Sequence, residues 1–191
     1  MNDPIVNDAA PGVGAGVPAH DMAGPAGASA LRLLWLSGAL IALDQATKWL
    51  VTSRFELYER STWLPVLEIT RLHNRGAAFS FLNDASGWQH YFFITLACGV
   101  SAGIVYWLSR LRLPASRLLA SGLALILGGA LGNVIDRLLH GYVVDFIHFH
   151  WFETWYFPAF NVADSGITIG AGLLLLDTLL ESRRAGPAPQ P

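Results

Sequence analysis

The stretch GNVIDRLLHGYVVDFIHF, residues 132–149, decides the fold of this chain together with FNVADSGITIG, residues 160–170. Each stretch lies where an apolar segment meets polar residues, and each contains an aspartate, Asp145 in the first and Asp164 in the second. A carboxylate in or beside a bilayer is costly unless it is paired or lines a wet cavity, so both are candidate functional residues. Two carboxylates that lie close together can share a proton and activate a water molecule.

The composition of the 191 residues places the chain among membrane proteins. Mean hydropathy is +0.42 and only 14% of the residues are charged, which is typical of a small polytopic membrane protein. The net charge of −2 gives no reason to expect nucleic acid as a partner. The single cysteine, Cys98, excludes an internal disulfide and a cysteine-rich metal site.

Four segments are apolar enough to cross a bilayer core, which takes about 20 helical residues. They cover about residues 31–51, 88–108, 118–135 and 160–180. The second and third contain no Asp, Glu, Lys or Arg, whereas the first carries Asp44 and Lys48 and the fourth carries Asp164 and Asp177. The sequence therefore predicts an all-α integral membrane protein with four transmembrane helices in one domain, residues 31–184.

The two ends of the chain and its arginines predict the orientation. Residues 1–30 have no Lys or Arg, so they lack the basic region of a secretory signal, and we interpret them as a disordered cytoplasmic tail. Residues 185–191 are interpreted as a second disordered tail. Arg110, Arg112 and Arg117 lie between the second and third segments, and the positive-inside rule then places both termini in the cytoplasm. The first outer loop also contains arginines, which weakens this signal.

The outer segments, residues 54–87 and 137–159, predict a small extracytoplasmic β-rich region. Leu67, Ile69 and Arg71 alternate with residues of the other face, which indicates a strand that ends in a turn at residues 74–76. Residues 142–156 are β-branched and aromatic and could pair with this strand. Gly76 could be the hinge of a mobile first loop, with Phe79 and Phe81 as an apolar lid.

Polar residues that are scattered along the sequence collect at one depth in this topology. Convergence of so many polar groups is harder to explain by packing than a lone buried ion pair would be. The set comprises Asp44, Lys48, Asn74, Arg75, Asn133, Asp136, Arg137, Asp145, Asn161 and Asp164.

The motifs around these residues resemble those of the prolipoprotein signal peptidases, or signal peptidase II. The resemblance covers nearly all of the chain from the first to the fourth apolar segment, in the same order. The motifs are LDQATKW (residues 43–49), NRGAAFSF (74–81), GGALGNVIDR (128–137), GYVVDFIHF (141–149) and FNVADSGITIG (160–170).

The resemblance implies an aspartyl endopeptidase of the bacterial inner membrane, with its active site near the periplasmic face. Its substrates would be diacylglyceryl-modified prolipoproteins, cut just before the lipidated cysteine, and globomycin would inhibit it. Asp145 and Asp164 match the catalytic aspartates of the family, and the other eight polar residues match its supporting positions. No cofactor and no metal is expected, membrane lipid would surround the enzyme, and it would act as a monomer.

Several residues have alternative interpretations. Asp136 beside Arg137 could replace Asp145 in the catalytic pair, but a structural ion pair at a helix end is the simpler interpretation. Asn133 and Asn161 each lie three residues before an aspartate, on the same helical face, where they could orient a carboxylate or join helices.

Three alternative functions also remain open. The HxH pair His148 and His150 invites a zinc hypothesis, but Asp145 and His148 would point to opposite faces of a strand. A proton-coupled transporter would show repeats and midplane polar sites, and a membrane assembly factor would not need two convergent aspartates.

Three glycine pairs spaced four apart, 99/103, 128/132 and 166/170, predict close helix packing.

Overall fold

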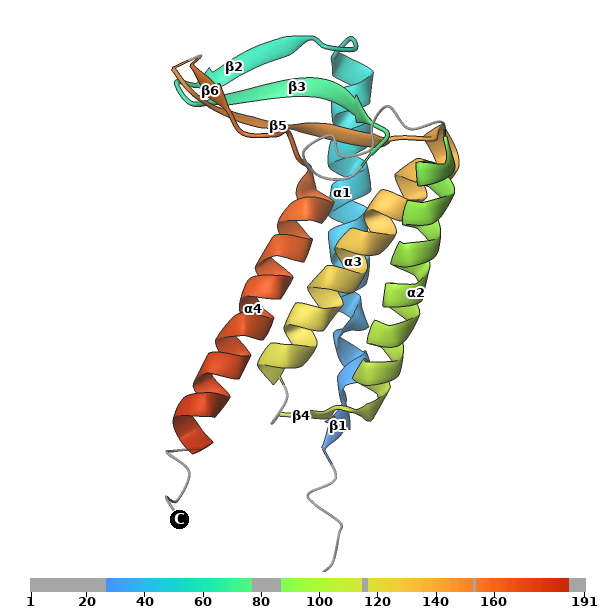
Figure 1. The fold of residues 1–191 in the computed structure, drawn as a ribbon, viewed down its shortest axis with the longest axis vertical. Coiled ribbons are helices and arrows are strands. Elements are labelled where there is room, and N and C mark those ends of the chain that lie inside the picture. Colours follow the sequence, from blue (N-terminus) through green and yellow to red (C-terminus); the bar gives the residue numbers. More distant parts are fainter. Residues whose placement is uncertain (1–26, 77–86, 115–116, 153, 186–191) are drawn as a thin grey trace, which may run out of the picture.

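The computed structural model describes residues 27–76, 87–114, 117–152 and 154–185. Four long helices in this part of the chain run side by side (Figure 1): α1 (Leu34–Arg54), α2 (Trp88–Arg110), α3 (Arg117–His140) and α4 (Val162–Ala185). They match the four predicted apolar segments with shifted ends. The ends of α3 and α4 each lie five residues beyond the prediction, and α3 continues to His140 through the start of the predicted outer segment 137–159. The proposed lid residues Phe79 and Phe81 lie outside the described residues.

Three of these helices, α2, α3 and α4, are long and apolar enough to cross a membrane. Helix α1 is not among them, because its 21 residues include Asp44, Lys48 and Arg54 beside several hydroxyl side chains. Many large apolar side chains on the outer faces of the helices are exposed, among them Trp49, Leu96 and Leu175. An apolar outer surface of this extent is expected where lipid, not water, contacts the helices.

Helix α3 lies at the centre of the bundle. In its most apolar window 56% of the residues are buried, against 17% for α2 and for α4. Glycines let its neighbours approach: a methyl group built on Gly128 would lie 2.9 Å from the backbone of Ser37 in α1. The expectation of close packing was wrong for Gly99 and Gly103, because no atom lies within 4 Å of a methyl group built on either residue. Both face outward on α2.

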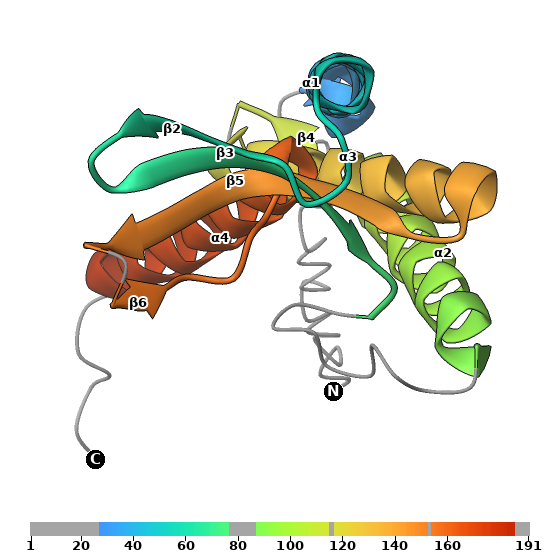
Figure 2. The ribbon, with the colours of Figure 1, turned by 90° about the horizontal axis from the view of Figure 1, so that it is seen from above.

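A four-stranded antiparallel sheet lies across one end of the helices (Figure 1). Its strands are β2 (Arg60–Leu64), β3 (Leu67–Asn74), β5 (Val143–Trp151) and β6 (Trp155–Tyr156), in the order β2-β3-β5-β6. Seen from above, β3 and β5 cross over the ends of the helices (Figure 2). The predicted strand at residue 67 and its pairing with the second outer segment are both confirmed, with Leu72 opposite Asp145.

Arg71 of β3 fixes the sheet to the end of α1. Its guanidinium donates hydrogen bonds to the carbonyl oxygens of Thr52, at 3.3 Å, and Phe55, at 2.9 Å. These carbonyls belong to the last turn of the helix, where backbone acceptors have no partner within the helix. The contact therefore caps α1 and joins it to the sheet.

The opposite end of the bundle carries a second, two-stranded sheet. Strand β1 (Ala28–Ser29) pairs with β4 (Arg112–Leu113), and the 3-10 helix η1 (Ala30–Leu33) leads from β1 into α1. The last residues of the predicted tail, 28–30, thus belong to the folded domain. Nearby, the buried core consists of Ala30, Ile104, Leu108, Ala120, Leu123 and Leu127.

Candidate active site

A tight turn after α3 places Asp145 beside the helix bundle. Gly141 ends the helix with a φ of 79°, and its N–H donates to the carbonyl oxygen of Arg137 at 2.9 Å. Glycine adopts this left-handed conformation without steric cost, as is common at helix C-termini. Strand β5 begins two residues later at Val143, so Asp145 is the third residue of the strand.

The segment before α4 pairs with β5 and thereby places Asp164 near Asp145. Phe160 forms an isolated bridge with Ile147, and each N–H donates to the other's carbonyl, at 3.0 and 2.8 Å. Asn161 then begins α4 in a reciprocal cap: its side chain accepts from the N–H of Asp164 at 2.9 Å, and Asp164 accepts from the N–H of Asn161 at 3.3 Å. This capping arrangement fixes the rotamers of both side chains.

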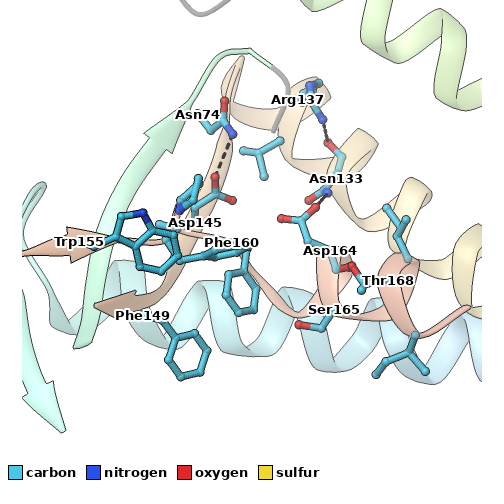
Figure 3. Close-up of a pocket in the computed structure, with 16 residues that line it drawn as sticks. Asn74, Asn133, Arg137, Asp145, Phe149, Trp155, Phe160, Asp164, Ser165 and Thr168 are labelled. Atoms are coloured by element: carbon cyan, nitrogen blue, oxygen red, sulfur yellow. Dashed lines mark hydrogen bonds between the residues drawn. The ribbon is translucent and has the colours of Figure 1, made fainter. Parts of the chain in front are cut away.

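Three asparagine side chains bind the two carboxylates, and Figure 3 shows two of them, Asn74 and Asn133. Asp145 accepts hydrogen bonds from the amides of Asn74, at 3.0 Å, and Asn161, at 2.8 Å. Asp164 accepts one from the amide of Asn133 at 2.8 Å. Asn133 was expected to share a helical face with Asp136, yet the carboxylate that it binds is Asp164 of the neighbouring helix.

The surroundings of Asp145 favour its protonated form. Burial raises the pKa of Asp145 to about 7, and the negative charge of Asp164 adds to this shift. The amides of Asn74 and Asn161 and the charge of Lys48 act in the opposite direction, because they stabilise the carboxylate. A carboxyl group with a pKa near neutrality can donate or accept a proton at physiological pH.

A buried ion group lies behind the two aspartates. The Lys48 ammonium contacts Asp44 at 2.8 Å and Asp136 at 2.9 Å. It also donates to the side-chain oxygen of Asn133 at 3.0 Å. Asp136 does form the expected structural ion pair, but its partner is Lys48 and not Arg137. Asp136 also accepts from the backbone N–H of Val144 at 3.0 Å.

The two predicted arginines differ in position. The Arg137 guanidinium donates to the carbonyl oxygen of Gly76 at 2.9 Å and lies over the ring of Phe93, 5.2 Å from its centroid. Arg137 thus fixes the turn that follows β3 and also lines the pocket. Arg75 in that turn is exposed and is not among the described residues that line the pocket.

A pocket of about 890 Å³ opens beside both aspartates. Asn74, Asn133 and Arg137 line it on the polar side (Figure 3). The remaining wall is mostly apolar and comes from β5, β6, the segment 157–160 and the first half of α4. Its members are Val143, Phe149, Trp155, Phe157, Pro158, Ala159, Phe160, Ser165, Ile167, Thr168 and Ile169. Interpretation of the sequence missed this wall, although the aromatic run of residues 149–160 is a visible signal for it.

His148 and His150 lie on the opposite face of β5 from Asp145, next to the carboxylate of Glu68. Their ring nitrogens are 3.7 and 3.9 Å from the Glu68 oxygens. Burial, with a smaller effect of Arg60, lowers the pKa of His148. Within the described ranges, no group of three or more His, Cys, Asp or Glu side chains has a geometry that could hold a metal ion.

Gln45 also belongs to this region, although interpretation of the sequence did not select it. Its side-chain amide donates to Asp136 at 2.9 Å, Asp44 at 3.2 Å and the carbonyl oxygen of Gly132 at 3.3 Å. A polar residue directly after Asp44 in the motif LDQATKW was the available signal.

Comparison with known proteins agrees with this geometry. Residues 36–180 match the sequence profile of the family described as signal peptidase (SPase) II. The lipoprotein signal peptidase of Actinobacillus succinogenes is 53% identical over 150 residues, which are 78% of this chain and 91% of that protein. That of Acinetobacter baylyi is 52% identical over 156 residues, or 80% of this chain and 86% of that protein.

A solved structure is also similar. A bacterial membrane enzyme determined by the in meso method at 2.3 Å resolution superposes with a TM-score of 0.69 at 30% sequence identity, and the match covers 84% of this chain and 94% of that one. The family profile spans most of the chain, including both aspartates and the amides that bind them. The chain therefore belongs to the signal peptidase II family of membrane peptidases.

Proposed function

We propose that this protein is a membrane aspartyl endopeptidase that removes the signal peptide from diacylglyceryl-modified prolipoproteins, with Asp145 and Asp164 as its catalytic pair. The observation that carries the proposal is the convergence of these two carboxylates on one pocket, each held by asparagine amides. By contrast, Asp44 forms an ion pair with Lys48 and is not among the described residues that line this pocket.

The environment of each aspartate supports a division of roles. Asp164 lies in the first turn of α4, where the helix dipole and the backbone N–H of Asn161 stabilise a negative charge. Asp145 is buried, and its pKa of about 7 keeps it protonated in a large part of the molecules. We therefore assign the ionised role to Asp164 and the proton of the pair to Asp145, with the two titrating as one unit.

The proposed reaction needs only water and these two groups. Asp164 takes a proton from a water molecule while the water oxygen attacks the scissile carbonyl carbon. Asp145 donates its proton to the carbonyl oxygen, which forms a tetrahedral diol. The proton now on Asp164 passes to the amide nitrogen, the C–N bond breaks, and the diol returns a proton to Asp145 as the new carboxyl group forms.

The apolar wall of the pocket supports a lipid-modified substrate. Phe149, Phe160 and Ile167 offer a surface on which acyl chains could lie, next to the aspartates. Apolar contact of this kind contributes about 25 cal/mol for each Å² removed from solvent. We expect the diacylglyceryl group on this wall and the peptide backbone between the wall and the asparagines. Globomycin, as an inhibitor of the family, is expected to occupy the same pocket.

The proposed topology has four transmembrane helices in the bacterial inner membrane, with both termini in the cytoplasm and the sheet at the periplasmic face. Arg112 lies at the end of the bundle opposite the sheet, which agrees with the positive-inside rule (Figure 1). Because one chain supplies both aspartates, a monomer is sufficient for activity. Reporter fusions at residue 191 and at the β2–β3 turn test the orientation. Cytoplasmic signal from the turn would refute it.

Cleavage of a diacylglyceryl-modified prolipoprotein tests the proposed activity. Purified wild type, Asp145→Asn, Asp164→Asn and Asp177→Asn are compared by mobility shift on a gel, with and without EDTA. Asp177 lies on α4 outside the pocket, so its variant is a matched control. We expect wild type and the control to cut regardless of EDTA, and both pocket variants to bind substrate without cutting. Cleavage by Asp145→Asn, or loss of cleavage in EDTA, would refute the catalytic pair.

A further inference from the structure

The ion group behind the active site contains two carboxylates and one ammonium group. Asp44, Lys48 and Asp136 contact one another through Lys48, and their side chains are 0%, 4% and 2% exposed. Lys48 can neutralise only one of the two carboxylates, so the group carries one excess negative charge in a buried position. Buried charge is tolerated only where hydrogen bonds compensate for the lost hydration.

Each of these carboxylates also holds the backbone next to a proposed catalytic aspartate. Asp44 accepts a hydrogen bond from the N–H of Ala163 at 2.9 Å, directly before Asp164. Asp136 accepts one from the N–H of Val144 at 3.0 Å, directly before Asp145. The distance between Asp44 and Asp136 therefore sets the distance between the two backbone positions that carry the catalytic pair.

The Gln45 amide bridges the same two carboxylates. Its nitrogen lies 2.9 Å from an oxygen of Asp136 and 3.2 Å from an oxygen of Asp44, and it also approaches the carbonyl oxygen of Gly132. A glutamine amide brings two N–H donors without a charge, so it can bind both anions and leave the ammonium of Lys48 free to bind Asn133. Gln45 does not line the pocket among the described residues.

We propose that Gln45 is a positioning residue for catalysis: its amide bridges Asp44 and Asp136 and so fixes the relative position of Asp145 and Asp164. Loss of the amide leaves the excess negative charge with fewer donors, and unpaired buried acceptors are costly. Lys48 is then drawn toward the carboxylates and away from Asn133, whose amide orients Asp164. The expected consequence is a misplaced catalytic pair in an otherwise intact pocket.

Steady-state kinetics of Gln45→Met test this inference, which rests on the proposed function. Methionine has a similar length and no donor. A misplacement of reacting groups by about 1 Å can cost on the order of 100-fold, so we expect kcat to fall roughly 10- to 100-fold. The KM should stay near that of wild type, because Gln45 does not touch the pocket. Thr52→Val is the matched control on α1, since the partners of the Thr52 hydroxyl among the described residues are backbone carbonyls of its own helix.

A double-mutant cycle distinguishes positioning from general destabilisation. The cycle compares the changes in activation free energy, calculated from kcat, of Gln45→Met, Asn133→Ala and the double variant. If Gln45 acts through Lys48 and Asn133, these changes must be non-additive, whereas independent sites give additive changes. A kcat equal to that of Thr52→Val, a loss mainly in KM, or an additive cycle would each overturn the inference. Inactivity of Asp145→Asn and Asp164→Asn tests the proposed function separately, so the two failures are distinguishable.

A second variant covers the case in which Gln45→Met does not fold. Gln45→Glu keeps the size of the side chain and can donate one hydrogen bond while it is protonated. The charged groups that face it are Asp44 and Lys48 on α1 and Asp136 on α3. We expect its kcat relative to wild type to fall as the pH rises and the new carboxyl group ionises. A kcat equal to wild type at every pH would overturn the inference.

Discussion

At the residue scale, the raised pKa of Asp145 predicts the pH dependence of the enzyme. If Asp145 supplies the proton, kcat/KM should fall as the pH rises above about 7, where Asp145 loses it. The amide of Asn74 lowers this pKa by binding the carboxylate. Asn74→Ala should therefore move the alkaline limb to higher pH, by up to about one unit. Thr62→Ala, in an exposed position on β2, should leave the limb unchanged. A limb that moves to lower pH in Asn74→Ala would contradict this assignment.

The same shift predicts that Asp145→Asn stabilises the folded protein although it removes the proposed catalytic group. The folded protein holds the Asp145 proton up to about pH 7, while an unfolded chain releases it near the ordinary aspartate pKa of 3.8. The contribution of Asp145 to stability therefore declines as the pH rises between these two values. Asp145→Asn removes the ionisation, so it should raise the free energy of unfolding at pH 8 relative to wild type by on the order of 1 kcal/mol, and by less at pH 5. A higher unfolding temperature in detergent at pH 8 would report this gain. A lower unfolding temperature at pH 8 than wild type would contradict the direction.

Single residues could be predicted where a charged side chain stands in apolar sequence, because burying such a charge is energetically costly. Hydrogen-bond partners could not be predicted, because they depend on which helices lie side by side. Asp145 and Asp164 stand out as carboxylates in apolar sequence. Helical spacing places Asn133 on the face of Asp136, but spacing says nothing about the adjacent helix that supplies Asp164. Gln45 is a neutral amide in a polar motif, so its role became visible only through its two partners.

At the element scale, glycine at the α1–α3 contact predicts a contrast between two otherwise similar substitutions. A methyl group on Gly128 would lie 2.9 Å from the Cα and carbonyl oxygen of Ser37, so backbone must move. Gly128→Ala should destabilise the protein by about 1–3 kcal/mol. Gly99→Ala on α2 meets open space and should be neutral or stabilising, because alanine favours helix by up to about 1 kcal/mol. Thermal unfolding in detergent measures both, and equal effects would contradict the packing.

The elements themselves were largely predictable, and their ends were not. Apolar runs indicated the four helices, and alternation at residues 67–72 indicated β3. The end of α3 was placed five residues too early, because Asp136 and Arg137 look like the polar boundary of a span. Both remain helical because they find partners inside the fold, Lys48 for Asp136 and Gly76 for Arg137.

At the scale of the whole molecule, we expect α1 to need contacts with the other helices in order to insert stably into the membrane. Its ion pair and polar residues exclude it from the helices that are apolar enough to span alone. A segment with a charged residue near its centre inserts poorly, at a cost of about 2.5–3.5 kcal/mol for each such residue. An insertion assay should therefore find efficient insertion of isolated α2 and poor insertion of isolated α1. A double variant of α1, Asp44→Leu with Lys48→Leu, should insert efficiently. Equal insertion of native α1 and α2 would contradict this dependence.

The contacts at the two ends of α1 have a consequence for how the helix can move. Strand β1 holds the chain at its beginning through β4, and Arg71 holds the carbonyls of its last turn. A helix that is anchored at both ends is held against movement along its axis. Its length therefore sets the separation between the two ends of the bundle. One residue added between Ser37 and Asp44 would rotate the anchors by about 100° and shift them by about 1.5 Å. The length of α1, as much as its chemistry, thus determines whether Asp44 and Lys48 lie level with the two aspartates of the proposed catalytic pair.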